Sequence, residues 1–520
     1  MSRPARGVWI AAALLVAGGL PPVGGLPPAE AGPLAALDAG AAPSPSTGDV
    51  LAQIFTLIER NYVDGVERPA ILRAAVEGML EKLDPHSSYF DSEEYKQLRE
   101  RYSGVYTGIG VEFAILDGWI TITEVYADSP AEVAGLQLGD QIVAIDERSA
   151  YGLDRDQASA LVQDQGPEVT QLTINRFGER QLMHFTVRRG PVRVRSVRAA
   201  FMLDHQIGFI RMSAFAHQAG QELDQALERL IAQGARRLIL DLRGNPGGLL
   251  QEAIAVADRF LPGGRKIVMT LGRRANLSDE YYTTDSPNDF LLPLIVLINH
   301  DSASASEIVA GALQDQDRAL LLGETTYGKG LVQSQFRLPD GGALLLTVAR
   351  YYTPSGRPIQ KEPGGRPLVE GPVKTAGGRI IPAGGGIHPD VPVEVDTAIP
   401  PLVIEWDRDH RLFQFAYRQL KISAKRWERP ETLVSEQLKD PLLVEDFRRY
   451  LEQEGQTVPT AEFAASAEEL RQQLIEEMVT QAFGNQAGLR LRLQRDPQFQ
   501  QAIELFPTAA ALARSIQPRM

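Results

Sequence analysis

Apolar residues recur along this chain with different spacings, and each spacing predicts a different kind of element. Residues 219–231 repeat apolar positions every three or four residues, as one face of an α-helix does. Residues 119–122 alternate apolar and polar positions, which is typical of a half-buried strand. Residues 238–242 and 292–299 are nearly continuous apolar runs, typical of strands buried on both faces. Because strands and helices alternate in this part of the chain, we expect an α/β layer structure.

The same patterns divide the 520 residues into segments of different character. A Pro- and Ala-rich linker precedes a helical region, a small β-rich unit follows, and the α/β core leads into a helical tail. The predicted segments are a signal peptide or anchor (1–31), a linker (32–47), an N-terminal helical region (48–103), a β-rich domain (104–190), the α/β core (191–396) and a C-terminal helical region (397–520).

Residues 1–31 have the features of an export signal. Arg3 and Arg6 give a positive start, residues 8–20 form a short apolar run, and Ala29-Glu30-Ala31 offers a cleavage site. Cleaved, this segment is a signal peptide; uncleaved, it anchors the chain in the inner membrane. In both cases we expect the body of the protein in the periplasm or another extracytoplasmic space.

The two helical regions carry apolar stripes. In the N-terminal region we expect a small packing unit built on Leu51, Ile54, Phe55 and Ile58. In the C-terminal region the stripes contain Leu470, Leu474, Met478 and Phe483, and then Phe499, Ile503 and Phe506. This tail can serve as a packing cap, an oligomerisation arm or a docking surface for an activating adaptor.

Composition excludes several classes of function. The formal net charge of −13 argues against nucleic acid as a partner. Cysteine is absent, so disulfides, thiolate metal sites, a cysteine nucleophile and a lipid-modified cysteine are excluded. The seven histidines are scattered and no H-E-x-x-H motif occurs, so we expect neither a metal site nor a cofactor.

Two short stretches are candidates for catalysis. Ser304 follows a predicted strand and opens a predicted helix, and Ser304-x-x-Glu307 is also the pattern of a helix-capping box. Lys329 stands between two glycines, which allow close packing of the backbone around it. A desolvated lysine can lose its proton and act as a base toward a serine hydroxyl. Capping and catalysis are both open on these residues alone.

Together the two stretches resemble a known family. Ser302-Ala303-Ser304-Ala305-Ser306-Glu307 and Gly328-Lys329-Gly330-x-x-Gln333 are similar to the serine and lysine motifs of the carboxy-terminal processing (tail-specific) proteases, serine peptidases with an embedded PDZ domain. The resemblance implies a ClpP/crotonase-like core in which Ser304 is the nucleophile, Lys329 the general base and Gln333 its orienting partner. It also implies homo-oligomers built by terminal helices.

The resemblance extends to a glycine turn. The predicted strand 238–242 runs into Arg243-Gly244-Asn245-Pro246-Gly247-Gly248, which matches the family's D-L-R-x-N-x-G-G motif. Glycines at such a turn can point N–H groups outward, as an oxyanion hole requires. We expect the hole to consist of the N–H of Gly247 or Gly248 together with that of Ala305.

The β-rich segment matches the PDZ pattern, and a plain β-sandwich insert is the alternative. In a PDZ domain the loop Gly108-Ile109-Gly110-Val111 would bind a free carboxylate while the ligand adds as a strand. Phe113 and Leu161 would line the adjoining apolar pocket with Val111 and Ala158. The expected partners are therefore polypeptides with apolar C-termini. Residues 162–166 lack the basic residue that members of this family often carry to couple the domain to the catalytic lysine. Either this coupling is absent here, or it uses another residue such as Arg155.

Two alternatives to the Ser-Lys protease remain. His300 and Asp301 lie close to Ser304 in sequence, so a Ser-His-Asp triad is one. A noncatalytic PDZ scaffold with a protease fold is the other. The serine, lysine, glutamine and glycine turn together favour an exported serine endopeptidase.

Overall fold

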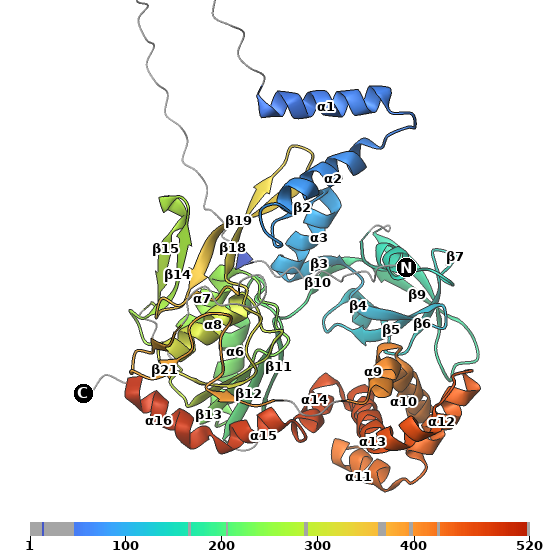
Figure 1. The fold of residues 1–520 in the computed structure, drawn as a ribbon. Coiled ribbons are helices and arrows are strands. Elements are labelled where there is room, and N and C mark those ends of the chain that lie inside the picture. The colour runs from blue at the N-terminus through green and yellow to red at the C-terminus, as the bar shows by residue number, and fades with distance from the viewer. Residues whose placement is uncertain are drawn as a thin grey trace, which may run out of the picture. The chain divides into compact units, whose positions relative to one another are not determined.

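The structure is a computed structural model, and it describes residues 13–14, 46–164, 168–203, 206–284, 290–361, 371–394, 399–423 and 427–516 (Figure 1). The predicted signal and linker lie outside these residues, apart from β1 (Ala13–Leu14) and the last two linker positions. The chain forms two compact units. The larger unit contains residues 97–332 and 349–520, and the smaller unit contains residues 14–96 and 333–348.

A six-stranded sheet forms the centre of the larger unit. Its order is β11-β12-β13-β16-β17-β22; β11 is antiparallel to β12, and the other neighbours are parallel. All five residues of β16 are buried, which explains the continuous apolar run in its sequence. The strands are β11 (Val197–Met202), β12 (Ile207–Met212), β13 (Arg237–Asp241), β16 (Leu294–Ile298), β17 (Leu320–Gly323) and β22 (Val391–Pro392).

Helices cover both faces of this sheet. The connections between its strands supply α6 (Ala219–Ala232), α7 (Leu250–Asp258) and α8 (Ala305–Asp315). The end of the chain supplies α15 (Pro497–Glu504) and α16 (Phe506–Ile516), whose Phe499 and Phe506 pack against Phe209 and Ile295. The predicted α/β core with helical regions before and after it is confirmed.

The rest of the C-terminal region has a core of its own. The predicted stripe of Leu470, Leu474 and Met478 is buried there with Trp406 and Phe447. Both stripes of the tail are thus covered within the chain, as in a packing cap. The helices are α9 (Pro401–Arg408), α10 (Arg411–Ile422), α11 (Pro430–Lys439), α12 (Leu443–Gln453), α13 (Thr460–Phe483) and α14 (Asn485–Leu493).

The β-rich segment folds into a sheet of order β4-β5-β6-β8-β9, with β7 beside β6. β4 lies at its edge, and β3 pairs separately with β10. The elements are β3 (Val105–Gly108), β4 (Val111–Leu116), β5 (Trp119–Val125), α4 (Pro130–Ala134), β6 (Gln141–Ile145), β7 (Arg148–Ser149), α5 (Arg155–Ser159), the π-helical turn η1 (Ala160–Asp164), β8 (Val169–Asn175), β9 (Met183–Arg188) and β10 (Gly190–Arg193).

The smaller unit contains the N-terminal helices and part of the hairpin formed by β18 and β19. β2 pairs antiparallel with the start of β19. The elements wholly within this unit are α1 (Thr47–Asn61), α2 (Arg68–Leu80) and β2 (Ser88–Phe90). The division between the units passes through α3 (Ser92–Ser103), β18 (Leu331–Arg337) and β19 (Ala343–Tyr352). The remaining elements, in the larger unit, are β14 (Lys266–Gly272), η2 (Ala275–Leu277), β15 (Asp279–Tyr282), β20 (Val373–Lys374) and β21 (Ile380–Ile381).

The expected packing of the N-terminal stripe is not found. No residue of α1 is buried, and Leu51 and Ile54 are each about half exposed. The reason is that the described chain supplies no second apolar surface to cover this face, although the helix itself forms and is capped by Ser46.

Across the described ranges, none of the helices has the length and apolar character needed to cross a membrane.

Candidate active site

Ser304 lies where β16 passes into α8 and occupies the N-cap position of that helix. Its backbone has φ 55° and ψ −110°, a conformation that non-glycine residues rarely adopt. The side chain is fully buried, and Oγ has no hydrogen-bond partner among the described residues. The hydroxyl therefore does not cap the helix, and only the carboxylate half of the capping box is formed.

That carboxylate, Glu307, connects the serine turn to the lysine loop. Its Oε2 accepts from the N–H groups of both Ser304 and Lys329, each at 2.8 Å. Its Oε1 accepts from Gly328 N–H at 2.7 Å and from Thr326 Oγ1 at 2.6 Å. Burial raises the pKa of the Glu307 carboxyl, and these four hydrogen bonds oppose the rise.

Lys329 is held in a loop that packs tightly on both sides. It is 3% exposed. A side chain at Gly330 would come within 2.4 Å of Gln360 N, and one at Gly328 within 2.8 Å of Lys361 Cβ. Glycines on both sides of the lysine are therefore required by close packing, as the sequence indicated.

The glycine turn after β13 lies directly against the serine turn. The carbonyl of Asn245 accepts from Ala303 N–H at 3.0 Å and from Ser306 Oγ at 2.9 Å. A Cβ at Gly247 would come within 2.9 Å of both Ala305 N and Ser304 Cβ. Gly247 and Ala305 thus lie together beside Ser304, and Gly248 is the next residue of the same turn. The φ angles of +100° at Gly247 and +152° at Gly248 favour glycine at both positions.

The contacts distinguish between the two glycines. Gly247 N–H donates to Asn245 Oδ1 at 2.9 Å, so it is already engaged. Ala305 N–H belongs to the first turn of α8, where N–H groups have no partner within the helix. Gly247 therefore provides the close approach to the serine turn rather than a free donor. The pair of Gly248 N–H and Ala305 N–H as oxyanion donors stays a prediction.

Sequence reasoning missed a contact that anchors this turn from behind. Arg243 pairs with Asp241 and donates through Nη1 to Asp496 at 2.5 Å and to Gln498 at 3.0 Å. Asp496 is the N-cap of α15, in the C-terminal region. Burial opposes ionisation of Asp241, but the Arg243 guanidinium holds its pKa below the ordinary value. No local pattern could reveal a pair 253 residues apart.

His300 lies in a different setting from Ser304. Its side chain is 72% exposed, and Nδ1 is 2.8 Å from Glu324 Oε2. That hydrogen bond raises the pKa of the imidazole. A surface His-Glu pair beside a buried serine argues against the Ser-His-Asp alternative. Within the described ranges, no group of three His, Asp or Glu side chains could hold a metal ion.

Gln333 belongs to the smaller unit and is buried there. Its Nε2 donates to the carbonyl oxygen of His86. Its proposed role toward Lys329, four residues earlier in the chain, stays a prediction.

The predicted ligand-binding residues of the β-rich segment gather in one apolar cluster. Ile109, Val111 and Phe113 are buried, with Leu161 packed against them. Gly108 ends β3, and Gly110 has φ +88°, so the loop between β3 and β4 turns as a glycine-rich loop does. Within the turn 162–166, which lacks a basic residue, residues 165 and 166 lie outside the described part of the chain.

Three models of known protein families match parts of this chain. The sequence model of peptidase family S41 matches residues 206–370, that of a PDZ domain matches residues 121–176, and that of the activating protease CtpB N-terminal domain matches residues 39–94.

Three relatives are carboxy-terminal processing proteases. The protein of Bartonella bacilliformis is 39% identical over 313 residues, covering 59% of this chain and 71% of that protein. CtpA of Bacillus subtilis is 35% identical, covering 63% and 70%. The protein of Synechocystis is 38% identical, covering 60% and 78%.

Proposed function

Because this chain belongs to the carboxy-terminal processing proteases, which are serine peptidases of family S41, we propose that it cleaves peptide bonds with a Ser304-Lys329 dyad. The observation that carries the proposal is the Glu307 carboxylate, which accepts from the backbone of both residues. The unpartnered Oγ of Ser304 supports it further. A buried hydroxyl without a hydrogen-bond partner lowers the stability of the fold, and such groups are therefore rare outside functional sites.

The proposed reaction has two halves. Neutral Lys329 takes the proton of Ser304 Oγ as that oxygen attacks the peptide carbonyl, and the Gly248 and Ala305 N–H groups stabilise the oxyanion. The lysine then gives the proton to the leaving amine. Water attacks the acyl-enzyme in the second half and regenerates Ser304, with Gln333 orienting the lysine.

The PDZ domain is the proposed substrate receptor. β4 is an edge strand, so an incoming polypeptide can add to it by backbone hydrogen bonds. The loop of Gly108, Ile109 and Gly110 would receive the terminal carboxylate. If the domain controls the dyad, Arg155 at the start of α5 is a candidate to replace the missing basic residue of the coupling turn.

Three further proposals concern the setting of the enzyme. The body of the protein lies outside the cytoplasm, exported or anchored by residues 1–31. The chain forms homo-oligomers through α1, whose exposed stripe of Val50, Leu51, Ile54 and Leu57 needs a partner surface. The C-terminal helices can also dock an activating adaptor.

Cleavage of an unfolded model protein tests the proposal. Two forms are compared, one with an apolar C-terminus and one with the same terminus amidated, and products are mapped by mass spectrometry. We expect wild type to cut the free-carboxylate form faster, and Ser304→Ala to cut neither. Equal rates on both forms would argue only against the PDZ domain as the receptor of the free C-terminus, and not against the Ser-Lys dyad. Cleavage by folded Ser304→Ala would contradict the assignment of Ser304 as the nucleophile. A wild-type protein that cleaves neither form but still binds C-termini would favour the noncatalytic scaffold.

A further inference from the structure

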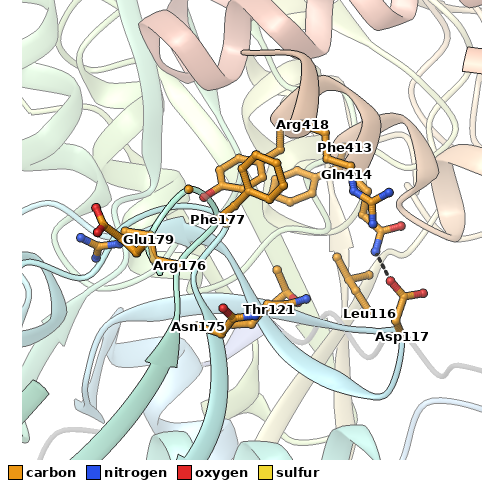
Figure 2. Close-up of a pocket in the computed structure, with 14 residues that line it drawn as sticks. Leu116, Asp117, Thr121, Asn175, Arg176, Phe177, Glu179, Phe413, Gln414 and Arg418 are labelled. Atoms are coloured by element: carbon orange, nitrogen blue, oxygen red, sulfur yellow. Dashed lines mark hydrogen bonds between the residues drawn. The ribbon is translucent and has the colours of Figure 1, made fainter. Parts of the chain in front are cut away.

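Beyond the proposed dyad, polar side chains join separate elements of the larger unit at several places. One is the wall of a cavity of about 400 Å³ between strands of the PDZ domain and helix α10, where Asp117 accepts from Gln414 Nε2 at 2.9 Å (Figure 2). This cavity shares no residue with the candidate active site. Another place is the lysine loop, residues 326–330, and its contacts bear directly on the position of Lys329.

The hydroxyl of Thr326 forms hydrogen bonds in both directions. Thr326 is 1% exposed, and its Oγ1 accepts from Ile387 N–H at 2.7 Å and donates to Glu307 Oε1 at 2.6 Å. Because a hydroxyl has a single proton, donation to the carboxylate leaves its lone pairs for the amide. Thr326 thus joins Ile387 to the carboxylate that also binds the backbone of Ser304 and Lys329.

A segment that follows β19 binds the second half of the lysine loop. Lys361 N–H donates to Gly328 O at 2.9 Å, and Gly330 N–H donates to Gln360 Oε1 at 2.9 Å. Both glycines beside Lys329 therefore have partners from this segment. These contacts fix the main chain before and after the lysine.

The segment 386–390 binds the first half of the loop. Gly386 has a φ of +98°, and a Cβ there would come within 2.7 Å of Thr326 O, so this close approach requires glycine. Thr326 N–H donates to Ile387 O at 3.1 Å, so these two residues exchange two hydrogen bonds. Gly386 N–H donates to Ile359 O at 3.0 Å, which connects the two supporting segments.

Helix α8 holds the segment 386–390 from its last turn. Gln314 donates through Nε2 to His388 O at 2.9 Å and to Asp390 Oδ1 at 3.0 Å. Glu307 lies in the first turn of the same helix. One helix therefore carries the carboxylate that binds the lysine loop and also fixes the segment that supports Thr326.

The position of Thr326 requires a hydroxyl group. The side chain must accept from an amide and donate to a carboxylate at the same time, which a methyl group cannot do. Valine has the shape of threonine without the hydroxyl, so it would leave the Ile387 N–H without its acceptor and Glu307 Oε1 without one donor. Serine keeps both hydrogen bonds.

We propose that Thr326 is a positioning residue for Lys329. Its hydroxyl, held by Ile387, fixes the Glu307 carboxylate and with it the spacing between the lysine loop and the serine turn. The inference rests on the proposed Ser304-Lys329 dyad. Thr326 acts through Glu307, so its loss should slow the chemical step and leave substrate binding unchanged.

Kinetics of full-length variants test the proposal. The rate of fluorophosphonate labelling and the steady-state kcat and KM are measured for wild type, Thr326→Val, Thr326→Ser and Lys329→Ala. We expect Thr326→Val to lower the labelling rate and kcat at least about tenfold with KM within about twofold of wild type, because small misplacement of reacting groups has large effects. Thr326→Ser should stay within about threefold of wild type. If Thr326→Val does not fold, Thr326→Cys replaces it and should fall between serine and wild-type loss of the hydroxyl, since a thiol is a weaker donor and acceptor.

Thr283→Val is the matched control. Thr283 is also buried, and its Oγ1 also accepts from a backbone N–H, that of Arg265 at 2.8 Å, and donates to an oxygen, that of Pro262 at 2.6 Å. Urea unfolding should show that both valine variants lose stability, while only Thr326→Val loses activity.

The outcomes separate this inference from the dyad itself. Wild-type kcat in Thr326→Val, a Thr326→Ser enzyme as slow as Thr326→Val, a change in KM alone, or an equal loss of kcat in Thr283→Val would overturn the positioning role while slow Lys329→Ala keeps the dyad. Labelling that is absent in wild type, or as fast in Lys329→Ala as in wild type, would contradict the dyad and this inference with it.

Discussion

The backbone N–H groups of Ser304 and Lys329 donate to one and the same oxygen, Oε2 of Glu307, each at 2.8 Å. The two residues are 25 positions apart in the chain, and this carboxylate fixes the distance between their backbones. Glu307 is therefore a positioning residue for the proposed dyad as well as part of a helix N-terminus.

Replacing Glu307 by glutamine should separate the two loops. An amide presents one oxygen where the carboxylate presents two, so N–H groups of the serine turn or the lysine loop lose their acceptor. We expect proteolysis to fall at least about 100-fold, because small misplacement of reacting groups has effects of that size. Each unpaired buried N–H should also cost about 1–3 kcal/mol of unfolding free energy.

Glu222→Gln is the matched control for this experiment. Glu222 also accepts a backbone N–H, that of Val197, at 3.0 Å, but lies on α6. Urea unfolding and steady-state kinetics of both variants separate stability from activity. A Glu307→Gln enzyme with normal kcat would contradict the positioning role.

The contact between Arg243 and Asp496 should affect turnover rather than substrate binding. Asp496→Asn weakens the anchor of the glycine turn, so the oxyanion donors are held less firmly. We expect kcat to fall about tenfold with KM nearly unchanged. Asp446→Asn, which breaks an exposed pair with Arg449 on α12, should leave both constants unchanged. A change in KM alone would argue against this role.

The C-terminal helix α16 should be essential for stability. Phe506 is 1% exposed and packs with Phe209 and Ile239 on the central sheet. Phe506→Ala should lower the unfolding free energy by about 3–5 kcal/mol. Ile404→Ala, at a position that is 52% exposed, should change it by less than about 0.5 kcal/mol. Chemical denaturation measures both values, and equal small effects would show that α16 is only loosely attached.

Stability should decrease in weakly acidic solution, in part through His388. Burial lowers the pKa of this imidazole, whose Nδ1 lies 3.0 Å from Thr325 Oγ1 and Nε2 3.2 Å from Gly384 O. Below the ordinary histidine pKa of about 6.5 the unfolded chain takes up the proton more readily than the folded one. The unfolding free energy should therefore fall as pH drops from about 7 toward 5. A His388→Gln variant should show a flatter profile, and an identical slope would rule out this contribution.

The sequence predicts the residues of the site better than their connections. Ser304, Lys329 and the glycine turn stand in compact motifs, and the structure brings them to one place. Glu307 is readable as a cap because its partner is three residues away, whereas its bond to Lys329 spans 22 residues and leaves no local pattern. Asp496 is still more remote from Arg243.

The helical ends show a second limit of sequence patterns. Apolar stripes on α1 and on α15 look alike in sequence, yet Ile54 is 47% exposed and Phe499 is 3% exposed. Periodicity predicts that a helix has an apolar face, but the surface that covers this face depends on the tertiary fold or on another chain.

Covalent labelling tests the dyad most directly. A fluorophosphonate reacts with a serine hydroxyl that a neighbouring base activates, and peptide mapping by mass spectrometry locates the adduct. We predict a single adduct on Ser304 in wild type and in His300→Ala, and at least about 100-fold slower labelling in Lys329→Ala that retains its fold. Labelling of Lys329→Ala at the wild-type rate, or an adduct on Ser302 or Ser306 in place of Ser304, would contradict the account.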